Sequence, residues 1–369
     1  MPDAGADPPS LRRLSAYFLR LGATGFGGPI ALVESMRREL VVERGWFSRD
    51  DFSQSLALSQ LAPGPLAAQV AVCLGFLHSR IRGATVVLMA FVAPSFLLTL
   101  LLGALYVRAG GMSWIAIAFY GVGAVVIGVI VLSAVRLARS TAGRDPVLWG
   151  IAATLAVVTA WRAEEVLWLF PLAGLMGMIP ARRGIVASVT VVPQLFWYFA
   201  KAGAFVFGSG LAIVPFLYAG VVTQHGWLSE RQFLDAIAVA MLTPGPVVIT
   251  AAFIGFLVAG VTGAAAATAG VFLPAFLITV TALPLLTRFV EKPGVKGFVR
   301  GVTAAAAGAI AGACVVLGRR AIIDAPTALI AMAALVLMAR TRVPTGVLVL
   351  GGAVAGLVAS AAGLVPAAP

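Results

Sequence analysis

Apolar segments long enough to cross a lipid bilayer follow one another along most of this chain. The clearest of them are residues 84–107, 114–135, 146–161, 165–179, 262–287, 297–318, 326–339 and 343–365. They are rich in Ala, Gly, Val and Leu and lack the alternation that is typical of a transmembrane β-strand. Only 11% of the residues are charged, whereas a soluble domain carries about a quarter. The sequence therefore predicts an all-α polytopic (multi-pass) membrane protein.

The basic charge of the chain fits a membrane protein better than a nucleic-acid-binding one. The formal net charge is +12, but the arginines fall mainly between apolar segments, where they mark the cytoplasmic side of a membrane. We therefore expect the lipid bilayer as a partner and no nucleic acid. Arg12, Arg13 and Arg20 predict a cytoplasmic N-terminus, and residues 1–10 are predicted to form a disordered tail.

The chain contains the same unit twice. Residues 17–65 align with residues 198–246 without a gap, and many of the paired residues are identical. After a single-residue deletion the alignment continues to about residues 122 and 302. We therefore predict two homologous repeats, residues 11–185 and residues 186–369, each about half of the chain.

The charges of equivalent segments favour opposite orientations of the two repeats in the membrane. Segment 78–83 carries two arginines while its counterpart 258–263 carries none, and segment 109–113 is uncharged while its counterpart 288–300 is basic. Such a bias predicts inverted repeats, a plan that is common among secondary carriers. The basic segment 136–144 also has a basic counterpart, which argues for parallel repeats.

Each repeat begins with two interruptions of an otherwise apolar pattern. The first is GFGGP at 25–29 or VFGSG at 206–210, and the second is Pro-Gly-Pro at 63–65 or 244–246. Proline suits the first turn of a helix, so each break predicts a new half-helix that starts near the membrane midplane. The unpaired N–H groups and the dipole at such a start attract anions. The alternative is a structural kink or a close packing of helices.

Helix ends alone are too weak to hold a small anion away from water. Each contributes about 0.3–2 kcal/mol, whereas transferring an isolated ion to an apolar medium costs tens of kcal/mol. Arg20 aligns with Lys201, and both precede a Phe-Gly pair in an apolar segment. We expect them to supply positive charge, although Arg20 could instead reach the cytoplasmic interface. Asp235, which aligns with Gln54, either carries a proton or forms a local ion pair with Arg231.

The breaks and the two cations together define the predicted substrate site. Its predicted members are Arg20, Phe26, Gly27, Gly28, Pro29, Gln60, Pro63, Gly64, Pro65, Lys201, Phe207, Gly208, Ser209, Thr243, Pro244, Gly245 and Pro246. The sequence has no cysteine pair with metal-ligand spacing, no histidine cluster and no Gly-x-Ser-x-Gly or Walker motif. We therefore expect no metal, no cofactor and no enzymatic activity.

These motifs together resemble the chromate ion transporter family in its long, two-domain form. The resemblance covers nearly the whole chain after residue 10 and is carried by FGGP at 26–29, RGWFS at 44–48, LSQLAPGPLA at 58–67, FGSG at 207–210, HGWLS at 225–229 and LTPGPV at 242–247. It implies a carrier with inverted halves that exports chromate, gives resistance to it, and has sulfate as a competitor or co-substrate. The second half departs from the first, since Ser209-Gly210 stands in place of Gly28-Pro29.

The expected function is thus a secondary carrier that exports chromate across the inner membrane, driven by the membrane potential or by anion exchange. A transporter of sulfate or another oxyanion and a channel on the same architecture are the alternatives. A membrane-embedded reductase or hydrolase is disfavoured by the missing motifs. The sequence leaves open whether the chain forms a homodimer.

Overall fold

The computed structural model of the protein describes residues 9–26, 28–109, 113–143, 145–162, 191–204, 213–286, 293–341, 343 and 345–364. Within these residues every regular element is helical, as predicted. The first half contains α1 (Leu11–Thr24), α2 (Gly28–Met36), η1 (Arg37–Glu43), α3 (Arg49–Leu61), α4 (Leu66–Ala109), α5 (Ser113–Ala142) and α6 (Pro146–Arg162). The second half contains α8 (Val191–Ala204), α9 (Val214–Leu217), η3 (Tyr218–Gln224), α10 (Glu230–Leu242), η4 (Val247–Ile249), α11 (Thr250–Leu286), α12 (Pro293–Ala321), α13 (Ala325–Arg340) and α14 (Thr345–Ala361).

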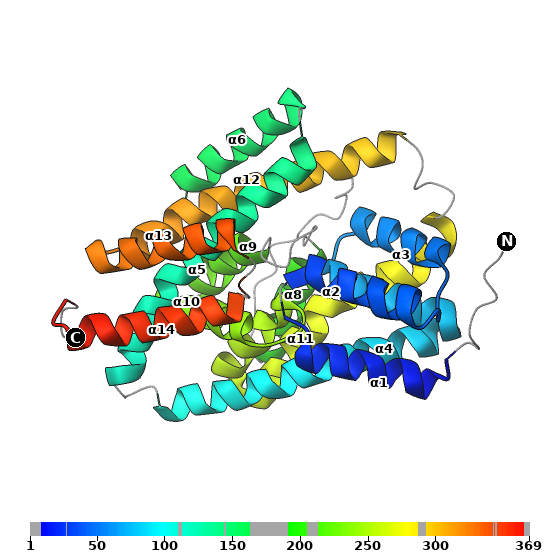
Figure 1. The fold of residues 1–369 in the computed structure, drawn as a ribbon, viewed down its shortest axis with the longest axis horizontal. Coiled ribbons are helices and arrows are strands. Elements are labelled where there is room, and N and C mark those ends of the chain that lie inside the picture. Colours follow the sequence, from blue (N-terminus) through cyan, green and yellow to red (C-terminus); the bar gives the residue numbers. More distant parts are fainter. Residues whose placement is uncertain are drawn as a thin grey trace.

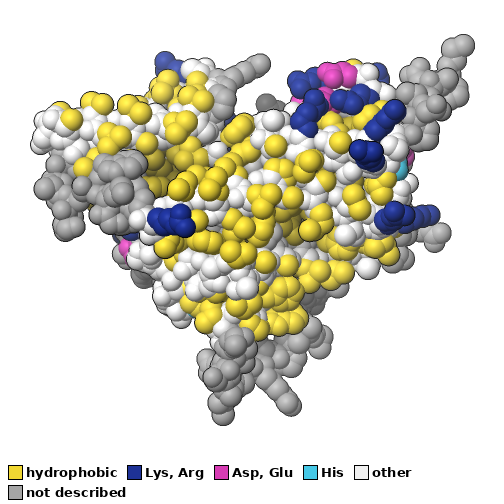
Figure 2. Space-filling model, turned by 90° about the horizontal axis from the view of Figure 1, so that it is seen from below, with side chains coloured by type: hydrophobic (Ala, Val, Ile, Leu, Met, Phe, Trp, Pro, Cys, Tyr) yellow, Lys and Arg dark blue, Asp and Glu magenta, His cyan; other side chains and the backbone are white. Residues whose placement is uncertain are grey.

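Among the residues that the structure describes, three helices are long and apolar enough to cross a membrane: Leu66–Arg108, Ile117–Ala142 and Val247–Thr281. Shorter apolar helices accompany them, including Pro146–Ala160 and Thr345–Ala361. Hydrophobic side chains cover most of the face shown in Figure 2, while Lys and Arg lie toward its edges. This distribution fits a protein that contacts lipid tails around its middle and water at its ends.

The apolar outer surface follows the helical period. On α4 the side chains of Met89, Leu97, Leu101 and Leu105 are all at least half exposed, and they recur at multiples of four residues. Residues with this spacing lie on one face of a helix. A soluble protein rarely exposes so long a row of large apolar side chains, so this face of α4 is suited to lipid.

The two longest helices are each bent back into a hairpin. In α4 the backbone leaves the helical region at Ser79 and Arg80, where φ of Arg80 is 51°. A Cβ atom placed on Gly75 would lie 2.6 Å from the carbonyl oxygen of Gly83, although residues eight apart on a straight helix are separated by about 12 Å. Helix α11 turns in the same way at Ala259 and Gly260. Each hairpin therefore consists of a short helix after Pro-Gly-Pro and a longer helix that runs back.

Two glycines at aligned positions allow the first helix of each half to pack closely on the hairpin. A Cβ atom on Gly22 of α1 would lie 2.2 Å from the carbonyl oxygen of Phe91, and one on Gly203 of α8 would lie 2.1 Å from that of Val271. No side chain fits at such distances without moving the backbone. The core around these contacts contains Phe18 and Phe199, both fully buried.

Helices of the first half pack directly against helices of the second half. Helix α4 of the first half contacts α11 of the second, and α5 contacts α12. Helix α6 packs on α12, while α13 and α14 pack on α5, so these helices lie against the opposite half. In Figure 1 the elements α1 to α4, α8 and α11 gather on one side of the molecule, and α6, α12 and α13 gather on the other. A space between these groups can therefore be lined by both halves.

Some expected boundaries need correction. The apolar span 114–135 was expected to end before a basic loop at 136–144, but α5 continues to Ala142. Likewise, part of the basic segment 288–300 belongs to α12, which begins at Pro293. Arg136, Arg139 and Arg300 of these segments therefore lie on helices. The chain turns at Gly45, where φ is 60°. Ser48 and Ser229 cap the helices that follow, since each serine Oγ accepts a hydrogen bond from the N–H three residues later.

Candidate functional site

The first break separates helix α1 from helix α2, as predicted. Helix α1 ends at Thr24, and the N–H of Gly25 donates to the carbonyl oxygen of Leu21 at 2.7 Å. Phe26 is 48% exposed, and Pro29 is the second residue of α2. Gly27 lies outside the described residues, as do Phe207, Gly208 and Ser209 of the corresponding break in the second half.

The Pro-Gly-Pro sequences interrupt both halves at the expected place. Helix α3 ends at Leu61 and α4 begins at Leu66, while α10 ends at Leu242 and η4 begins at Val247. The glycines take positive φ angles of 144° at Gly64 and 95° at Gly245, where a side chain is disfavoured. Pro65 was expected to open its half-helix; it lies one residue before α4, and its carbonyl oxygen accepts from the N–H of Gln69 at 2.9 Å.

The second Pro-Gly-Pro is held against the first half of the chain. The N–H of Gly245 donates to the carbonyl oxygen of Gly25 at 2.8 Å, which joins the two kinds of break directly. The Oγ of Ser95, on the long arm of α4, donates to the carbonyl oxygen of Pro244 at 2.7 Å. The first Pro-Gly-Pro meets the second half at the aligned position, because a Cβ on Gly64 would lie 2.6 Å from that of Ala275.

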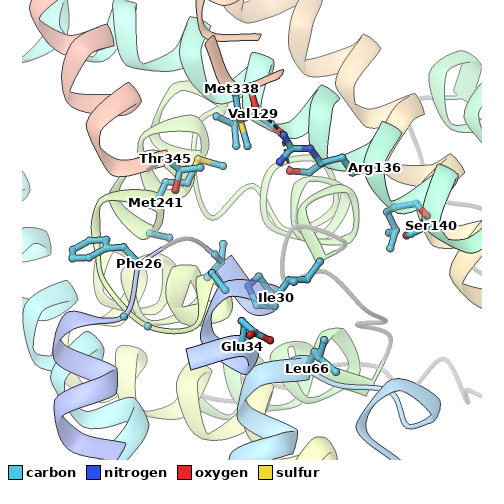
Figure 3. Close-up of a pocket in the computed structure, with 18 of the residues that line it drawn as sticks. Phe26, Ile30, Glu34, Leu66, Val129, Arg136, Ser140, Met241, Met338 and Thr345 are labelled. Atoms are coloured by element: carbon cyan, nitrogen blue, oxygen red, sulfur yellow. Dashed lines mark hydrogen bonds between the residues drawn. The ribbon is translucent and has the colours of Figure 1, made fainter. Parts of the chain in front are cut away.

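A cavity of about 1140 Å³ lies where these parts meet. Its lining comes from the first break, the second Pro-Gly-Pro, α5, α12, and the facing ends of α13 and α14. In Figure 3, Ile30, Glu34 and Leu66 lie on one side of the cavity, and Val129, Arg136 and Met338 lie on the other. The cavity is thus formed between the halves and has a mixed apolar and polar wall.

Two arginines provide positive charge in this wall. An Nη atom of Arg136 donates to the carbonyl oxygen of Met338 at 2.8 Å, as drawn in Figure 3. An Nη atom of Arg300 lies 3.5 Å from the carbonyl oxygen of Thr141. A guanidinium has five N–H donors in a planar fork that suits oxyanions. Each of these contacts with a carbonyl uses one Nη atom, so donors remain for a ligand.

Glu34 is the acid of the cavity wall, and its charge is compensated locally. Its two carboxylate oxygens accept hydrogen bonds of 2.9 and 2.6 Å from Nε and Nη of Arg37, one turn along the chain. This bidentate pair is strong for its type. The described cavity wall is therefore cationic, with Arg136 and Arg300 in excess over the neutralised Glu34.

The structure brings together only part of the predicted site. Phe26, Pro29, Gln60, Thr243 and Gly245 line the cavity. Pro63, Gly64, Pro65, Pro244 and Pro246, which flank the breaks, do not line it, and neither do Arg20 and Lys201.

The two predicted cations take other places. Arg20 on α1 forms an ion pair with Glu39 of η1, and its side chain is 54% exposed. Lys201 lies exposed on α8. Arg136 and Arg300 were missed as site residues because segments 136–144 and 288–300 were interpreted as charged loops. The helical pattern of residues 114–135 continues through Arg136, and this continuation could have indicated that Arg136 lies on the same helix.

The fold and the cavity define a helical membrane protein of the transporter class. The sequence model of the family described as "Chromate transporter" matches residues 12–178 and again residues 193–357. The chain therefore belongs to the chromate transporter family.

Its relatives are named as transport proteins. The chain is 50% identical to the "Chromate transport protein" of Cupriavidus metallidurans, covering 95% of this chain and 93% of that one. It is 46% identical to the "Probable chromate transport protein" of Synechococcus elongatus, covering 95% of both. A "Chromate transport protein" of Pseudomonas aeruginosa is 32% identical over 84% of this chain and 81% of its own length. No solved structure matches the chain.

Proposed function

We propose that this protein is a secondary carrier that exports chromate across the inner membrane and thereby makes its host resistant to chromate. The names of its relatives supply the substrate. The observation that carries the proposal is the cationic cavity between the halves, where the first break, the second Pro-Gly-Pro and two arginines converge. Chromate is a tetrahedral dianion, so both its charge and its oxygens suit this wall.

The arginines would contribute more to binding than the helix ends. A single opposite charge at about 4 Å contributes about 4 kcal/mol per unit of anion charge at an effective dielectric constant near 20. A helix end contributes about 0.3–2 kcal/mol. We therefore assign the main attraction to Arg136 and Arg300. The backbone at Gly25, Phe26 and Gly245 would shape the wall that the anion contacts, while the exposed Lys201 would attract anions from farther away.

Inverted repeats would allow such a site to open to either side. The aligned hairpin turns in α4 and α11, and the crossed packing of α6 on α12 and of α13 on α5, support this arrangement. One repeat would then rock against the other around a central site. The N-terminus would lie in the cytoplasm with the basic residues that follow it.

The membrane potential is sufficient to drive export. Each charge gains about 2.3 kcal/mol per 100 mV, so a dianion leaving an inside-negative cell gains about 4.6 kcal/mol at that potential. This energy supports an outward concentration ratio of about three decades. Anion exchange with sulfate is the second candidate mode. Sulfate is another tetrahedral dianion, and the charge and hydrogen-bond donors of the cavity wall would suit its oxygens as well as those of chromate.

Chromate flux into proteoliposomes tests the proposal. The purified full-length protein is reconstituted, and uptake is followed at set membrane potentials with and without sulfate inside. Saturable uptake driven by an inside-positive potential alone would support the electrogenic carrier. Uptake that requires internal sulfate and ignores the potential would indicate an exchanger, and single-channel currents would indicate a channel. Absence of chromate flux in every condition would refute the proposed function.

A further inference from the structure

A buried acid connects the two halves at a place that the proposed cavity does not use. Asp235 on α10 is 4% exposed. Its Oδ2 accepts a hydrogen bond of 2.6 Å from the hydroxyl of Tyr106, which lies on the long arm of α4 in the first half. Among the described residues, Tyr106 is the hydrogen-bond partner of this carboxylate, and no ion pair with Arg231 is formed. The expected alternative of a local Arg231–Asp235 ion pair is therefore not what the structure contains.

Aromatic rings surround this hydrogen bond. The ring of Tyr106 lies 5.8 Å from that of Phe119 on α5 and 5.5 Å from that of Phe253 on α11. Such surroundings stabilise a neutral carboxyl group more easily than a charged one, because an unpaired ion loses its hydration there. A single tyrosine hydroxyl compensates only part of that loss.

The elements packed on α10 bring few charges toward Asp235. Helices α11 and α14 and the short η4 contain no titratable side chain within their described bounds. The titratable groups of the other contacting elements, and of α10 itself, are Cys73, His78, Arg80, Arg82, Tyr106 and Arg108 on α4, Tyr120, Arg136 and Arg139 on α5, Tyr218 on η3, and Glu230 and Arg231 on α10. Tyr120 is bonded to Asp324, and Tyr218 to Glu230. Arg231 lies one turn before Asp235 and is exposed.

Asp235 is close enough to the cavity to sense an anion there. The same helix continues to Ala240 and Met241, which line the cavity with Thr243 just beyond. Five to eight residues of helix correspond to about 7–12 Å. A carboxylate and a dianion at about 10 Å repel each other enough, at an effective dielectric constant near 20, to change proton affinity by a factor on the order of 100. Occupation of the cavity therefore favours the protonated acid, and by reciprocity the protonated acid favours the anion.

We propose that Asp235 binds a proton together with the oxyanion, so that one proton crosses the membrane with each dianion. This inference rests on the proposed carrier function. The proton comes from water on the side to which the cavity is open, is held on the carboxylate, and returns to water on the other side with the anion. The net charge moved per chromate then falls from two to one. The aligned residue of the first half, Gln54, cannot carry a proton in this way, so each chain holds one such site.

The charge moved per anion can be measured without knowing the affinity. In proteoliposomes with a fixed chromate gradient, one determines the membrane potential at which net chromate flux is zero. This null potential is about twice as large for one charge per anion as for two, because the same gradient is balanced by the product of charge and potential. We expect the wild-type protein to show the larger value and to respond to an imposed pH gradient. Asp235→Asn, which resembles the protonated acid, is expected to show about half that value and no response.

Two further variants complete the design. Asp50→Asn removes an exposed acid in the first turn of α3 and is expected to keep the wild-type null potential and pH response. Tyr106→Phe removes the hydrogen bond that favours the carboxylate, so the pH dependence of chromate uptake should move to higher pH. If Asp235→Asn does not fold, the shift in Tyr106→Phe still decides the question, because protonation of the free chromate ion does not depend on Tyr106.

Several results would overturn the inference. Equal null potentials for wild type and Asp235→Asn would show that this acid carries no coupled proton. Transport of the singly protonated ion HCrO₄⁻ would also give the larger value in the wild type, but it would leave Asp235→Asn unchanged. Flux that ignores the potential in both proteins would contradict it as well. Absence of chromate flux in all variants and in the wild type would instead remove the proposed function itself.

Discussion

Replacing Gly245 with alanine tests the contact between the second Pro-Gly-Pro and the first half. Gly245 has φ of 95°, and an added Cβ atom would lie 2.1 Å from the Oγ of Ser95. The same Cβ would lie 3.3 Å from the carbonyl oxygen of Gly22. The substitution therefore adds backbone strain and also pushes apart two segments that the Gly245–Gly25 hydrogen bond holds together at 2.8 Å.

The expected cost has two parts. A non-glycine residue in a sparsely populated backbone region costs about 1–3 kcal/mol. Overpacking in a well-packed interior costs about another 1–3 kcal/mol. Gly226→Ala serves as the control, because Gly226 has φ of 59° but no atom within 4 Å of the added Cβ. Gly245→Ala should thus lower the free energy of unfolding by about 2–6 kcal/mol, and Gly226→Ala by the strain alone, about 1–2 kcal/mol.

A double-mutant cycle with Ser95→Ala isolates the overlap. Ser95→Ala alone loses the hydrogen bond to Pro244 and leaves a buried acceptor, at a cost of about 1–3 kcal/mol. In the double variant the Oγ is gone, and the Cβ at position 95 lies 3.3 Å from the added Cβ at position 245, so the overlap is relieved. The unfolding free energy, measured by denaturing-detergent titration in mixed micelles, should fall short of additivity by about 1–3 kcal/mol. Strictly additive losses of unfolding free energy would refute the inferred contact. The double variant should also transport chromate faster than Gly245→Ala alone.

Two further predictions concern charge and packing. Arg136→Gln should raise the KM for chromate by at least about tenfold, because a cation facing a dianion is lost, whereas Arg20→Gln should change it by less than about twofold since its ion pair with Glu39 is exposed. Flux assays measure the KM for chromate of both variants. An equal increase in KM for both would indicate that Arg20 also binds the anion. Gly22→Ala and Gly203→Ala should each destabilise the protein by about 1–3 kcal/mol or more, since the added Cβ meets a carbonyl oxygen at 2.2 and 2.1 Å. Gly301→Ala, with no atom within 4 Å, is the packing control, and similar melting curves for all three would contradict the argument.

The local structure of this protein could be predicted because short-range patterns determine it. Apolar segments indicated the long helices, and each Pro-Gly-Pro sequence begins two residues after the end of α3 or α10. The serine caps at Ser48 and Ser229 have the spacing that such caps require. These features depend on neighbours in the sequence, so the sequence alone is sufficient to find them.

The site could be predicted only in part, because it depends on contacts between distant residues. Arg136 was interpreted as a loop residue, whereas it lies on α5 and faces a cavity completed by Met338, some two hundred residues later. The pairing of Tyr106 with Asp235 also joins the two halves and leaves no trace in either local pattern. Arg20 looked suitable because it sits in an apolar segment, but Glu39 of the neighbouring η1 neutralises it.

The two halves differ in the residues that surround their Pro-Gly-Pro sequences. Ser95 fixes the second Pro-Gly-Pro through its Oγ, whereas Ala275 at the aligned position offers only a methyl group to the first. Asp235 is buried near the cavity, whereas the aligned Gln54 is exposed. The two Pro-Gly-Pro segments are similar, and these substitutions give the second one a hydrogen-bonded anchor and a buried acid nearby. If the substitutions exist for transport rather than packing, Ser95→Ala should impair chromate flux more than Ala275→Ser does at equal loss of stability. A flux loss that follows stability alone in both variants would assign the asymmetry to folding.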